Sequence, residues 1–598
     1  MDDILLEYQK KINLLSSELQ VMKNKFAYMY IARLISFIMC IAFIYIYYVY
    51  IQSSIMMVLS IASLITFFVL IKIDSKFVAR NKFLETKLEI NRNEVELING
   101  NYSQRKRGEE YSYINPHLTA DFEILGNGSL FQLLNRTSTK LGEQMFINNL
   151  CNSELNKQII LDKQVAIKEL KNKIDFVQNF QVYGSYFKEN KNELEYLSKW
   201  IDEPDRAINR ISMFCMVSPL VTLCWFLCYL FFNLPGNTVS IPIIINLMIV
   251  NFNMKNIEKS HAKLGKTSKI VKKYTRLISL IEIEDYNSKH LLEIKSHLYN
   301  NNISASKSIN QLFKLLSSFD TRYNLIASFI LNSLYGYNIQ TYYKLHKWKK
   351  NNGMYINKWF ESISKFDSLI SFSVFAYNNQ YATTYPLIEE DMFCFKANEI
   401  GHPLMPISRR VDNSINISNS PNIIIITGAN MAGKSTFLRT VATNLILAMN
   451  GSPVCAKELV FTPCDIMSSI KIQDSLSKNE SYFYAEISRL KDIVNHVKSG
   501  KRTMIVLDEI LRGTNTKDKQ IGSLGLLKKL ISDNSIVFIA THDLVIGDLE
   551  KTYPRIARNY CFEVELLNEH LTFDYKLKNG VSQKLNASFL LKKMDLID

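Results

Sequence analysis

Charged residues are absent from one long stretch near the start of the chain. Between Arg33 and Lys72 every residue is uncharged, and the run contains neither glycine nor proline. One helix needs about 20 residues to cross a bilayer core, so this run is too long for one crossing and suits two. We therefore predict a hairpin of two membrane-spanning helices, about 34–51 and 55–71. Its turn is expected near Gln52-Ser53-Ser54, the most polar point of the run.

A second uncharged stretch covers residues 211–254. Its middle, Asn233-Leu234-Pro235-Gly236-Asn237, has the composition of a tight turn, which predicts a second membrane hairpin within residues 206–256. For both hairpins the alternative is a buried core hairpin of a soluble protein, and Pro219 and Pro242 weaken the helical prediction for the second. A cleaved signal peptide fits the first run poorly, because that run is long and starts well inside the chain.

Basic residues flank both runs, and the loops inside the hairpins carry no charge. Positive flanks stay on the cytoplasmic side. Both hairpins should therefore dip outward from a bacterial inner (plasma) membrane, with the rest of the chain in the cytoplasm. The basic residues after the second run are Lys255, Lys259, Lys263, Lys266, Lys269, Lys272, Lys273 and Arg276. We interpret this segment as binding membrane lipids through their headgroups, with DNA as the alternative ligand.

Apolar residues before the first run are spaced alternately by three and four positions, the pattern of a coiled-coil seam. They are Leu5, Tyr8, Ile12, Leu15, Leu19, Met22 and Phe26, and a looser series follows the run at Phe77, Leu84, Leu88, Val95 and Ile98. These two arms are expected either to pair with each other in antiparallel fashion or to pack on the main body of the protein.

The pattern changes from helical to alternating at about Asn422. Short β-rich runs now alternate with helical ones, at Ile423–Thr427, Met504–Leu507 and Ile536–Ala540. This alternation predicts an α/β domain with a mostly parallel sheet. The predicted organisation is N-terminal arms with a hairpin at 1–110, an all-α core in two parts at 111–205 and 257–400, the second hairpin at 206–256, and the α/β domain at 401–598.

Composition narrows the classes of partner. Lys and Arg number 71 against 56 Asp and Glu, a net charge of +15, which favours nucleic acid, nucleotide or anionic lipid. Hydrophobic residues make up 47% of the chain, which excludes a mainly disordered protein. The cysteines form no CxxC pair, so neither a zinc site nor a dense disulfide framework is expected, and a reducing compartment fits.

The first strand of the α/β region leads into a phosphate-binding loop of the form G-x-x-x-x-G-K-[ST]. Its glycines let backbone amides face phosphates, and the helix that follows adds its positive N-terminus. Lys434 is expected to reach the β- and γ-phosphates of ATP, and Ser435 to supply an oxygen to Mg²⁺. The predicted ATP-binding residues are Gly428, Ala429, Asn430, Met431, Ala432, Gly433, Lys434, Ser435 and Thr436.

Two other predicted strands end in candidate catalytic residues. Asp508 and Glu509 follow one strand, where Asp508 is expected to organise Mg²⁺ and Glu509 to orient or deprotonate the attacking water. His542 follows the other, at the same carboxyl edge of the sheet, where it is placed to sense the γ-phosphate or to position water. The alternatives are an exposed acidic strand end and a structural histidine.

Together these residues resemble the MutS family of DNA mismatch-repair ATPases. TGANMAGKST at 427–436 is similar to the family's TGPNMGGKST, LDEILRGT at 507–514 to its LDEIGRGT, and ATH at 540–542 to its ATH. SYFYAE at 481–486 resembles STFMxE, a loop that in the family reaches the nucleotide of the opposite subunit. The resemblance therefore implies a homodimer in which Ser481 acts in trans, with ATP and Mg²⁺ as cofactors.

The resemblance is dense in the ATPase part and looser in the helical core. Ala429 and Ala432 replace Pro and Gly of the common loop, and Tyr482 replaces a Thr. The first hairpin stands where the family has its mismatch-reading domain, and no DNA-gripping clamp is identifiable between the two core parts. We therefore expect a membrane-anchored member without the N-terminal mismatch-reading domain.

Two functions fit these features. One is a membrane-anchored MutS-like ATPase that binds mismatched or otherwise non-standard DNA. A patch at Tyr342, Tyr343, Lys344, His346, Lys347, Trp348, Lys349 and Lys350 supports it, since basic residues neutralise phosphates and aromatic rings stack on bases. The patch can also be a solvated helix face with its apolar side buried. The other function is an ATP-driven membrane machine or scaffold that uses a MutS engine without DNA.

Overall fold

The computed structural model forms two compact units. The first contains residues 1–135, 147–182 and 371–598, and the second contains 136–146 and 183–370. The structure describes residues 2–50, 53–102, 105–187, 189, 193–204, 217–232, 235–252, 254–264, 267–300, 303–320, 324–418, 422–471, 482–532, 534–567 and 570–582.

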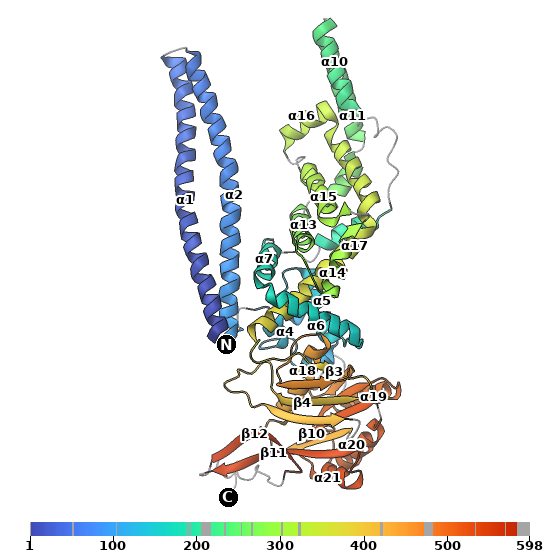
Figure 1. Cartoon of the computed structure of the whole chain (residues 1–598). Helices are drawn as coiled ribbons and strands as arrows, with labels where there is room; N and C mark the ends of the chain where they lie inside the picture. The colour runs from blue at the N-terminus through green and yellow to red at the C-terminus, as the bar shows by residue number, and fades with distance from the viewer. Residues whose placement is uncertain are drawn as a thin grey trace. The chain divides into compact units, whose positions relative to one another are not determined.

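Two long helices open the first unit, α1 (Asp2–Val49) and α2 (Ser54–Ile98). They lie side by side in antiparallel fashion (Figure 1). Ser53 caps α2 by accepting a hydrogen bond from the backbone of Ile55, so the helices meet where the sequence predicts a turn; Gln52 lies outside the described residues. Both helices are long and apolar enough to cross a membrane, and only 11% and 6% of their most apolar windows are buried, unlike the core helices of a soluble protein.

The arms of this hairpin pair with each other and also pack on the rest of the first unit. Leu19, Leu84 and Leu88 form a small apolar core between them, which confirms the predicted seam. Nearer the chain start, the buried Tyr8 hydroxyl donates to Asn378 Oδ1 at 2.8 Å. Asn378 in turn donates to the buried carboxylate of Glu94 at 2.7 Å. Both of the expected arrangements of the arms are therefore present, at different levels of the hairpin.

Short helices follow the hairpin. They are η1 (Glu109–Tyr111), α3 (Pro116–Asp121), α4 (Leu130–Leu134), α5 (Lys140–Cys151), α6 (Lys157–Asn172) and α7 (Ile174–Ser185). The fully buried carboxylate of Asp121 accepts hydrogen bonds from the backbone of Ile470 and Lys471, and it pairs with Arg489. The last residue of α3 is thereby tied to the C-terminal sheet domain.

The second unit is mainly helical, as predicted. Its elements are α8 (Glu193–Asp202), α10 (Ser218–Phe232), η2 (Gly236–Val239), α11 (Ser240–Phe252), α12 (Met254–Leu264), α13 (Ser268–Ile283), α14 (Lys289–Ser296), β1 (Tyr299–Asn300), β2 (Ile303–Ser304), α15 (Ala305–Asp320), α16 (Leu325–Tyr335) and most of α17 (Tyr337–Asn378). A buried carboxylate organises part of this unit: Asp367 accepts hydrogen bonds from the backbone of Ser138 and Thr139, just before α5. A Cβ at Gly142 would lie 2.2 Å from Asp367 Oδ2, so only glycine fits there.

The basic–aromatic patch lies on α17, and its aromatic side is buried. Tyr342 is 8% exposed and Trp348 is 4% exposed, and Trp348 donates its indole N–H to the backbone of Ser308. Lys344, Lys347 and Lys350 are exposed. This arrangement matches the alternative of a solvated helix face and leaves these two rings unable to stack on bases.

The C-terminal domain carries a six-stranded sheet of order β12-β11-β6-β10-β9-β8. The strands are β6 (Ile423–Gly428), β8 (Asp465–Ser469), β9 (Thr503–Asp508), β10 (Ser535–Thr541), β11 (Ala557–Leu567) and β12 (His570–Asn579). All neighbours are parallel except β11 and β12. The three predicted strands are thus confirmed, as is the mostly parallel α/β sheet.

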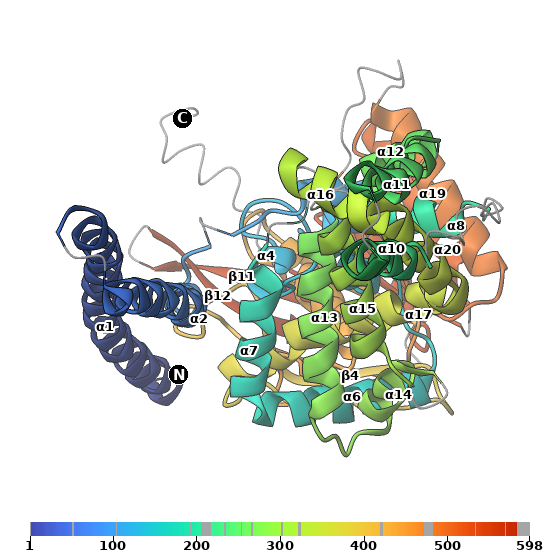
Figure 2. The same cartoon turned by 90° about the horizontal axis from the view of Figure 1, so that it is seen from above.

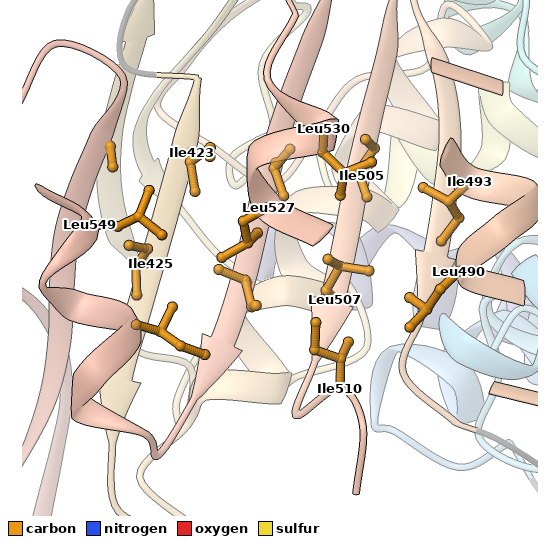
Figure 3. Packing of buried hydrophobic residues seen from close by; sticks show 14 of the residues in the cluster. Ile423, Ile425, Leu490, Ile493, Ile505, Leu507, Ile510, Leu527, Leu530 and Leu549 are labelled. Atoms are coloured by element: carbon orange, nitrogen blue, oxygen red, sulfur yellow. The ribbon is translucent and has the colours of Figure 1, made fainter. Parts of the chain in front are cut away.

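Alternating residues of the buried strands face two different layers. Ile423, Ile425 and Leu507 pack against α19 to α22 (Figure 3). Those helices are α19 (Tyr482–Lys498), α20 (Thr516–Leu530), α21 (Leu544–Gly547) and α22 (Leu549–Thr552). A strand whose two faces are both covered by apolar layers has a continuous apolar sequence. The unbroken runs of Ile and Val in these strands have this cause.

A second sheet lies against the other face. Its order is β3-β7-β4-β5, with β3 (Leu387–Ile388), β4 (Cys394–Ile400), β5 (Asn413–Ser418) and β7 (Glu458–Phe461). Phe395 of β4 meets Phe538 of β10 edge to face. The helix α18 (Lys434–Met449) is buried along almost its whole length. Strands β3 and β4 precede residue 401, so this sheet reaches back across the domain boundary expected there.

Leu507→Ala should loosen the six-stranded sheet. Leu507 is fully buried, so truncation leaves a cavity that costs about 2–5 kcal/mol. Hydrogen exchange of the β9 and β10 amides, read by mass spectrometry, should accelerate accordingly. The control Ile521→Ala removes a side chain that is 64% exposed on α20, and it should change stability by less than about 0.5 kcal/mol. Equal exchange in the two variants would contradict this packing.

Candidate active site

The loop between β6 and α18 has the backbone geometry of a phosphate cradle. Gly428 has φ 149°, Met431 φ 68° and Gly433 φ 105°. A Cβ at Gly428 would lie 2.6 Å from the carbonyl oxygen of Phe562, so no larger residue fits at this point. Lys434, the first residue of α18, folds back and donates from Nζ to the carbonyls of Gly428 at 2.7 Å and Ala429 at 2.9 Å. Burial lowers the pKa of Lys434.

The predicted Mg²⁺ ligands touch each other. Ser435 donates its hydroxyl to Asp508 Oδ2 at 2.6 Å, and burial raises the pKa of Asp508. Two protein oxygens suit Mg²⁺, which keeps waters and phosphate oxygens for most of its six positions. In the part of the chain that the structure describes, no cluster of three His, Cys, Asp or Glu could hold a metal alone. Ser435 and Asp508 would therefore share a bound Mg²⁺ with water and phosphate oxygens.

Glu509 projects from the end of β9 in a strained backbone conformation. Its φ is 48°, and its N–H donates to the carbonyl of Ala540 on β10 at 2.9 Å. His542 Nδ1 lies 3.6 Å from Glu509 Oε1, and an Arg512 guanidinium nitrogen lies 3.4 Å from Oε2. The structure thus brings Glu509 and His542 together, as the sequence predicts, and adds a cation beside the carboxylate.

Arg512 and Glu486 lie in the segments that resemble the MutS family, and the sequence assigns no role to either of them. Glu486 is buried and accepts the N–H of Leu511 at 2.6 Å, so it braces the segment that follows Glu509. Leu511 has φ 59° at the position where LDEIGRGT has a glycine. A leucine in this region is strained and must be held by its surroundings. The sequence does not predict the contact between Glu486 and Leu511, because the two residues are 25 positions apart in the chain.

A cavity of about 510 Å³ extends from the loop. Beyond the loop it is lined by Ile400, His402, Met405, Arg409, Val411, Asn413, Phe562 and Tyr575, among others. One end therefore offers the backbone of the loop, Lys434 and Glu509, and the other offers apolar and aromatic side chains beside a few polar ones. That division suits a phosphate-bearing ligand with a flat ring system. Most of these residues could not be predicted from the sequence to line one cavity, because they come from three separate segments of the chain.

His402 is the buried titratable group of this wall. It is 7% exposed, and its Nδ1 accepts the N–H of Leu404 at 3.2 Å. Burial lowers the pKa of His402 to about 4. The imidazole is therefore neutral at pH 7. Ser481, the residue predicted to act in trans, lies outside the described residues.

His402 should make stability fall on acidification. Its pKa is about 6.5 in the unfolded chain and about 4 when folded, so its contribution is complete at pH 7 and is lost as pH falls from 6.5 towards 4. Between pH 7 and pH 5 this amounts to about 2 kcal/mol. Urea unfolding at both pH values should show a loss that His402→Gln reduces and His117→Gln, at an exposed histidine, does not. The same loss in all three proteins would refute the assignment.

Comparison with known proteins shows which family the C-terminal domain is similar to. Residues 424–592 match the sequence model of MutS domain V. The chain is 31% identical over 228 residues to the DNA mismatch repair protein MutS of Thermotoga maritima, covering 38% of this chain and 28% of that protein. It is 36% identical over 195 residues to the MutS of Desulfatibacillum aliphaticivorans, covering 31% and 22%.

A third relative agrees with these two. The MutS of Bacteroides thetaiotaomicron is 34% identical over 233 residues, 37% of this chain and 26% of that protein. The chain thus spans only about a quarter of the length of the curated relatives that it matches. The region that matches MutS domain V, residues 424–592, contains the loop, Asp508 and Glu509. The C-terminal domain of this chain, residues 424–592, thus belongs to the MutS family through its match to MutS domain V.

Proposed function

We propose that this protein is a membrane-anchored, MutS-type ATPase that binds and hydrolyses ATP as a homodimer and binds mismatched or otherwise non-standard DNA. One observation carries the ATPase part: the 2.6 Å contact between Ser435 and Asp508, with Glu509 on the next residue and Lys434 on the one before. A hydroxyl, a lysine and two carboxylates converging on a glycine loop form the arrangement of phosphoryl-transfer ATPases.

Each side chain has a separate task in the proposed reaction. Lys434 neutralises the β- and γ-phosphates, while Ser435 and Asp508 hold Mg²⁺, which supplies charge neutralisation at the phosphates when bound. Glu509 orients the attacking water and accepts its proton. His542 and Arg512 both lie beside the Glu509 carboxylate, where they would hold it in place.

The dimer and the DNA are proposed from the relatives and from charge. The relatives are named DNA mismatch repair proteins, and in the resemblance Ser481 reaches the partner's nucleotide. The chain has a net charge of +15, and the exposed row Lys344, Lys347 and Lys350 on α17 presents cations to solvent. Phosphate contacts of this kind make binding strongly salt-dependent. Since Tyr342 and Trp348 are buried, the row is proposed to contact the DNA backbone and not the bases.

The membrane anchor is proposed from the exposed apolar surface of α1 and α2. Exposed residues include Ile38, Ile41, Ile61, Ile65 and Phe68. At the inner end of this surface Arg33 pairs with Asp74 at 2.8 Å, close to where charged residues resume. We propose an inner-membrane location in a bacterium, with the ATPase domain in the cytoplasm and with the second apolar stretch also in the membrane.

A second candidate function is an ATP-driven membrane machine or scaffold without DNA. The contact chain from Tyr8 through Asn378 to Glu94 favours it, because Asn378 ends α17 and the C-terminal domain follows. This joint ties the root of the hairpin to the segment that leads into the ATPase domain. Movement of that domain on ATP binding would then reach the membrane hairpin directly.

Glu509→Gln should keep ATP binding and slow hydrolysis by about 10²- to 10⁴-fold, the usual contribution of a general base. Glutamine preserves the shape of the side chain and cannot take the proton. Phosphate release measures turnover, and a fluorescent ATP analogue measures binding. Glu458→Gln, at an exposed carboxylate on β7, is the control and should match the native protein. Native turnover in the Glu509 variant would remove this residue from the mechanism.

The choice between the two functions can be made by titrating ATP turnover with DNA. Nanodisc-held protein would receive homoduplex, mismatched and branched DNA at two salt concentrations. The DNA-binding function predicts that one of these changes turnover and that the effect weakens at the higher salt. Turnover that no DNA changes, in protein that Glu509→Gln inactivates, would refute DNA binding and support the membrane machine.

A further inference from the structure

The helix α16 has its polarity inverted. It buries Asn332 and Ser333, each 6% exposed, while Ile326 is 75% and Phe329 62% exposed. Ile330 is 49% exposed on the same face. A helix at a water-exposed surface does the opposite, with its apolar stripe inward. The outward face of α16 is therefore suited to an apolar surrounding.

The neighbouring helices α10 and α11 share this inversion. Ser218 of α10 and Asn246 of α11 are each 2% exposed, whereas Phe231 is 79%, Met248 68% and Phe252 75% exposed. The three helices lie together in the second unit (Figures 1 and 2). None of them contains a charged residue. They form one cluster, called here the inverted cluster, with small polar groups inside and large apolar groups outside.

The polar groups inside the cluster have a common use. The last carbonyls of a helix lack partners within the helix. At the end of α16, the carbonyl of Ser333 accepts from Asn246 at 3.0 Å, and that of Leu334 accepts from Thr222 at 2.9 Å. The Tyr335 carbonyl accepts from Ser218 at 3.4 Å and from Gln340 at 2.7 Å. Side chains thus satisfy the backbone that water would normally solvate, as membrane interiors require.

The dimensions fit partial insertion. The helices α10, α11 and α16 have 15, 13 and 11 residues. At 1.5 Å per residue they are about 22, 20 and 16 Å long, less than the hydrocarbon core of about 30 Å. The segment Gly236–Phe252, which joins η2 and α11, has 17 residues and is likewise short. Apolar helices of about this length are typical of a buried core or of re-entrant and interfacial segments, and the exposed apolar faces here exclude a buried core.

Charge and shape identify the surrounding as lipid. The helix that follows α11, α12, exposes Lys255 and Lys259 together with Glu258, and its two cations suit anionic headgroups. A cavity of about 390 Å³ lies within the cluster, and its walls include Leu223, Phe226, Ile243 and Leu334. These mainly apolar walls suit an acyl chain.

We propose that α10, α11 and α16 insert together into one leaflet of an anionic membrane, with α16 as a membrane-embedded helix that neither hairpin contains, and that lipid acyl chains cover its outward face. The proposal rests on the membrane association in the proposed function and is independent of ATP hydrolysis. It extends the second apolar stretch by a helix that lies about 70 residues further along the chain and is brought to it only by folding.

Quenching of a probe on α16 would test the proposal. Full-length protein with Cys215, Cys224 and Cys228 changed to Ser would carry Phe329→Cys, labelled with an environment-sensitive fluorophore. It would be held in vesicles of phosphatidylethanolamine and phosphatidylglycerol. Lipids with a nitroxide on the acyl chain should remove most of the fluorescence, and aqueous iodide should remove little. Met354→Cys is the matched control: it is 78% exposed and lies about 25 Å along α17, where iodide should quench and the lipid should not.

A third label separates this proposal from membrane anchoring itself. Ile61→Cys lies 50% exposed on α2. Lipid quenching at 61 together with iodide quenching at 329 would overturn the proposal and leave the hairpin anchor in place. No lipid quenching at either position would overturn both. Protection of position 329 from both quenchers would show that another protein chain covers α16, which also overturns the proposal. ATP turnover of each labelled protein confirms that it is folded.

The depth of insertion is measured with a separate cysteine variant. An Asn237→Cys variant in sealed vesicles that present the ATPase domain outward should resist an impermeant thiol reagent trapped inside. Labelling from the inside would mean that the stretch crosses both leaflets, and that result would overturn insertion into a single leaflet.

Discussion

The parallel register of three strands is the constraint on which the rest of the site depends. Thr427 of β6 is paired with Thr541 of β10, and Asp508 of β9 with Ala540 of the same strand. Because parallel strands end at one edge, this register delivers the glycine loop, Glu509 and His542 to one place. It also brings Ser435 to within a hydrogen bond of Asp508, although β10 separates their strands. A shift by one residue would turn the carboxylates to the wrong side.

That edge is held under strain. Met431, Glu509 and Leu511 all have positive φ, which costs about 1–3 kcal/mol at each non-glycine residue. The surrounding contacts must offset this cost: the Glu509 N–H is anchored on β10 and the Leu511 N–H on the buried Glu486. Glu486 belongs to α19, whose first turn follows the segment of Ser481. A movement of α19 would therefore act on Leu511, two residues after the residue proposed to activate water.

The protein carries two apolar surfaces that differ in construction. The hairpin of α1 and α2 is long, and its inner half is a conventional seam of leucines. The inverted cluster is short and keeps its polar groups for the carbonyls at the end of α16. The hairpin is suited to spanning the membrane, and the inverted cluster is suited to a shallow insertion that ends within it. The buried joint of Tyr8, Asn378 and Glu94 connects the hairpin to the segment before the C-terminal domain.

The sequence by itself determined the elements whose pattern is local. Unbroken apolar runs predicted β6, β9 and β10, the glycine spacing predicted the loop, and the charge-free run predicted the first hairpin, because each depends on residues close together in the chain. Tertiary structure decided the features that depend on distant segments. These are the hydrogen bond between Glu486 and Leu511, the cavity wall that contains His402, and the burial of the aromatic residues on α17. It also decided the place of α16. An apolar helix has the same sequence pattern in a core and in a membrane, and only its packing shows which face is left outside.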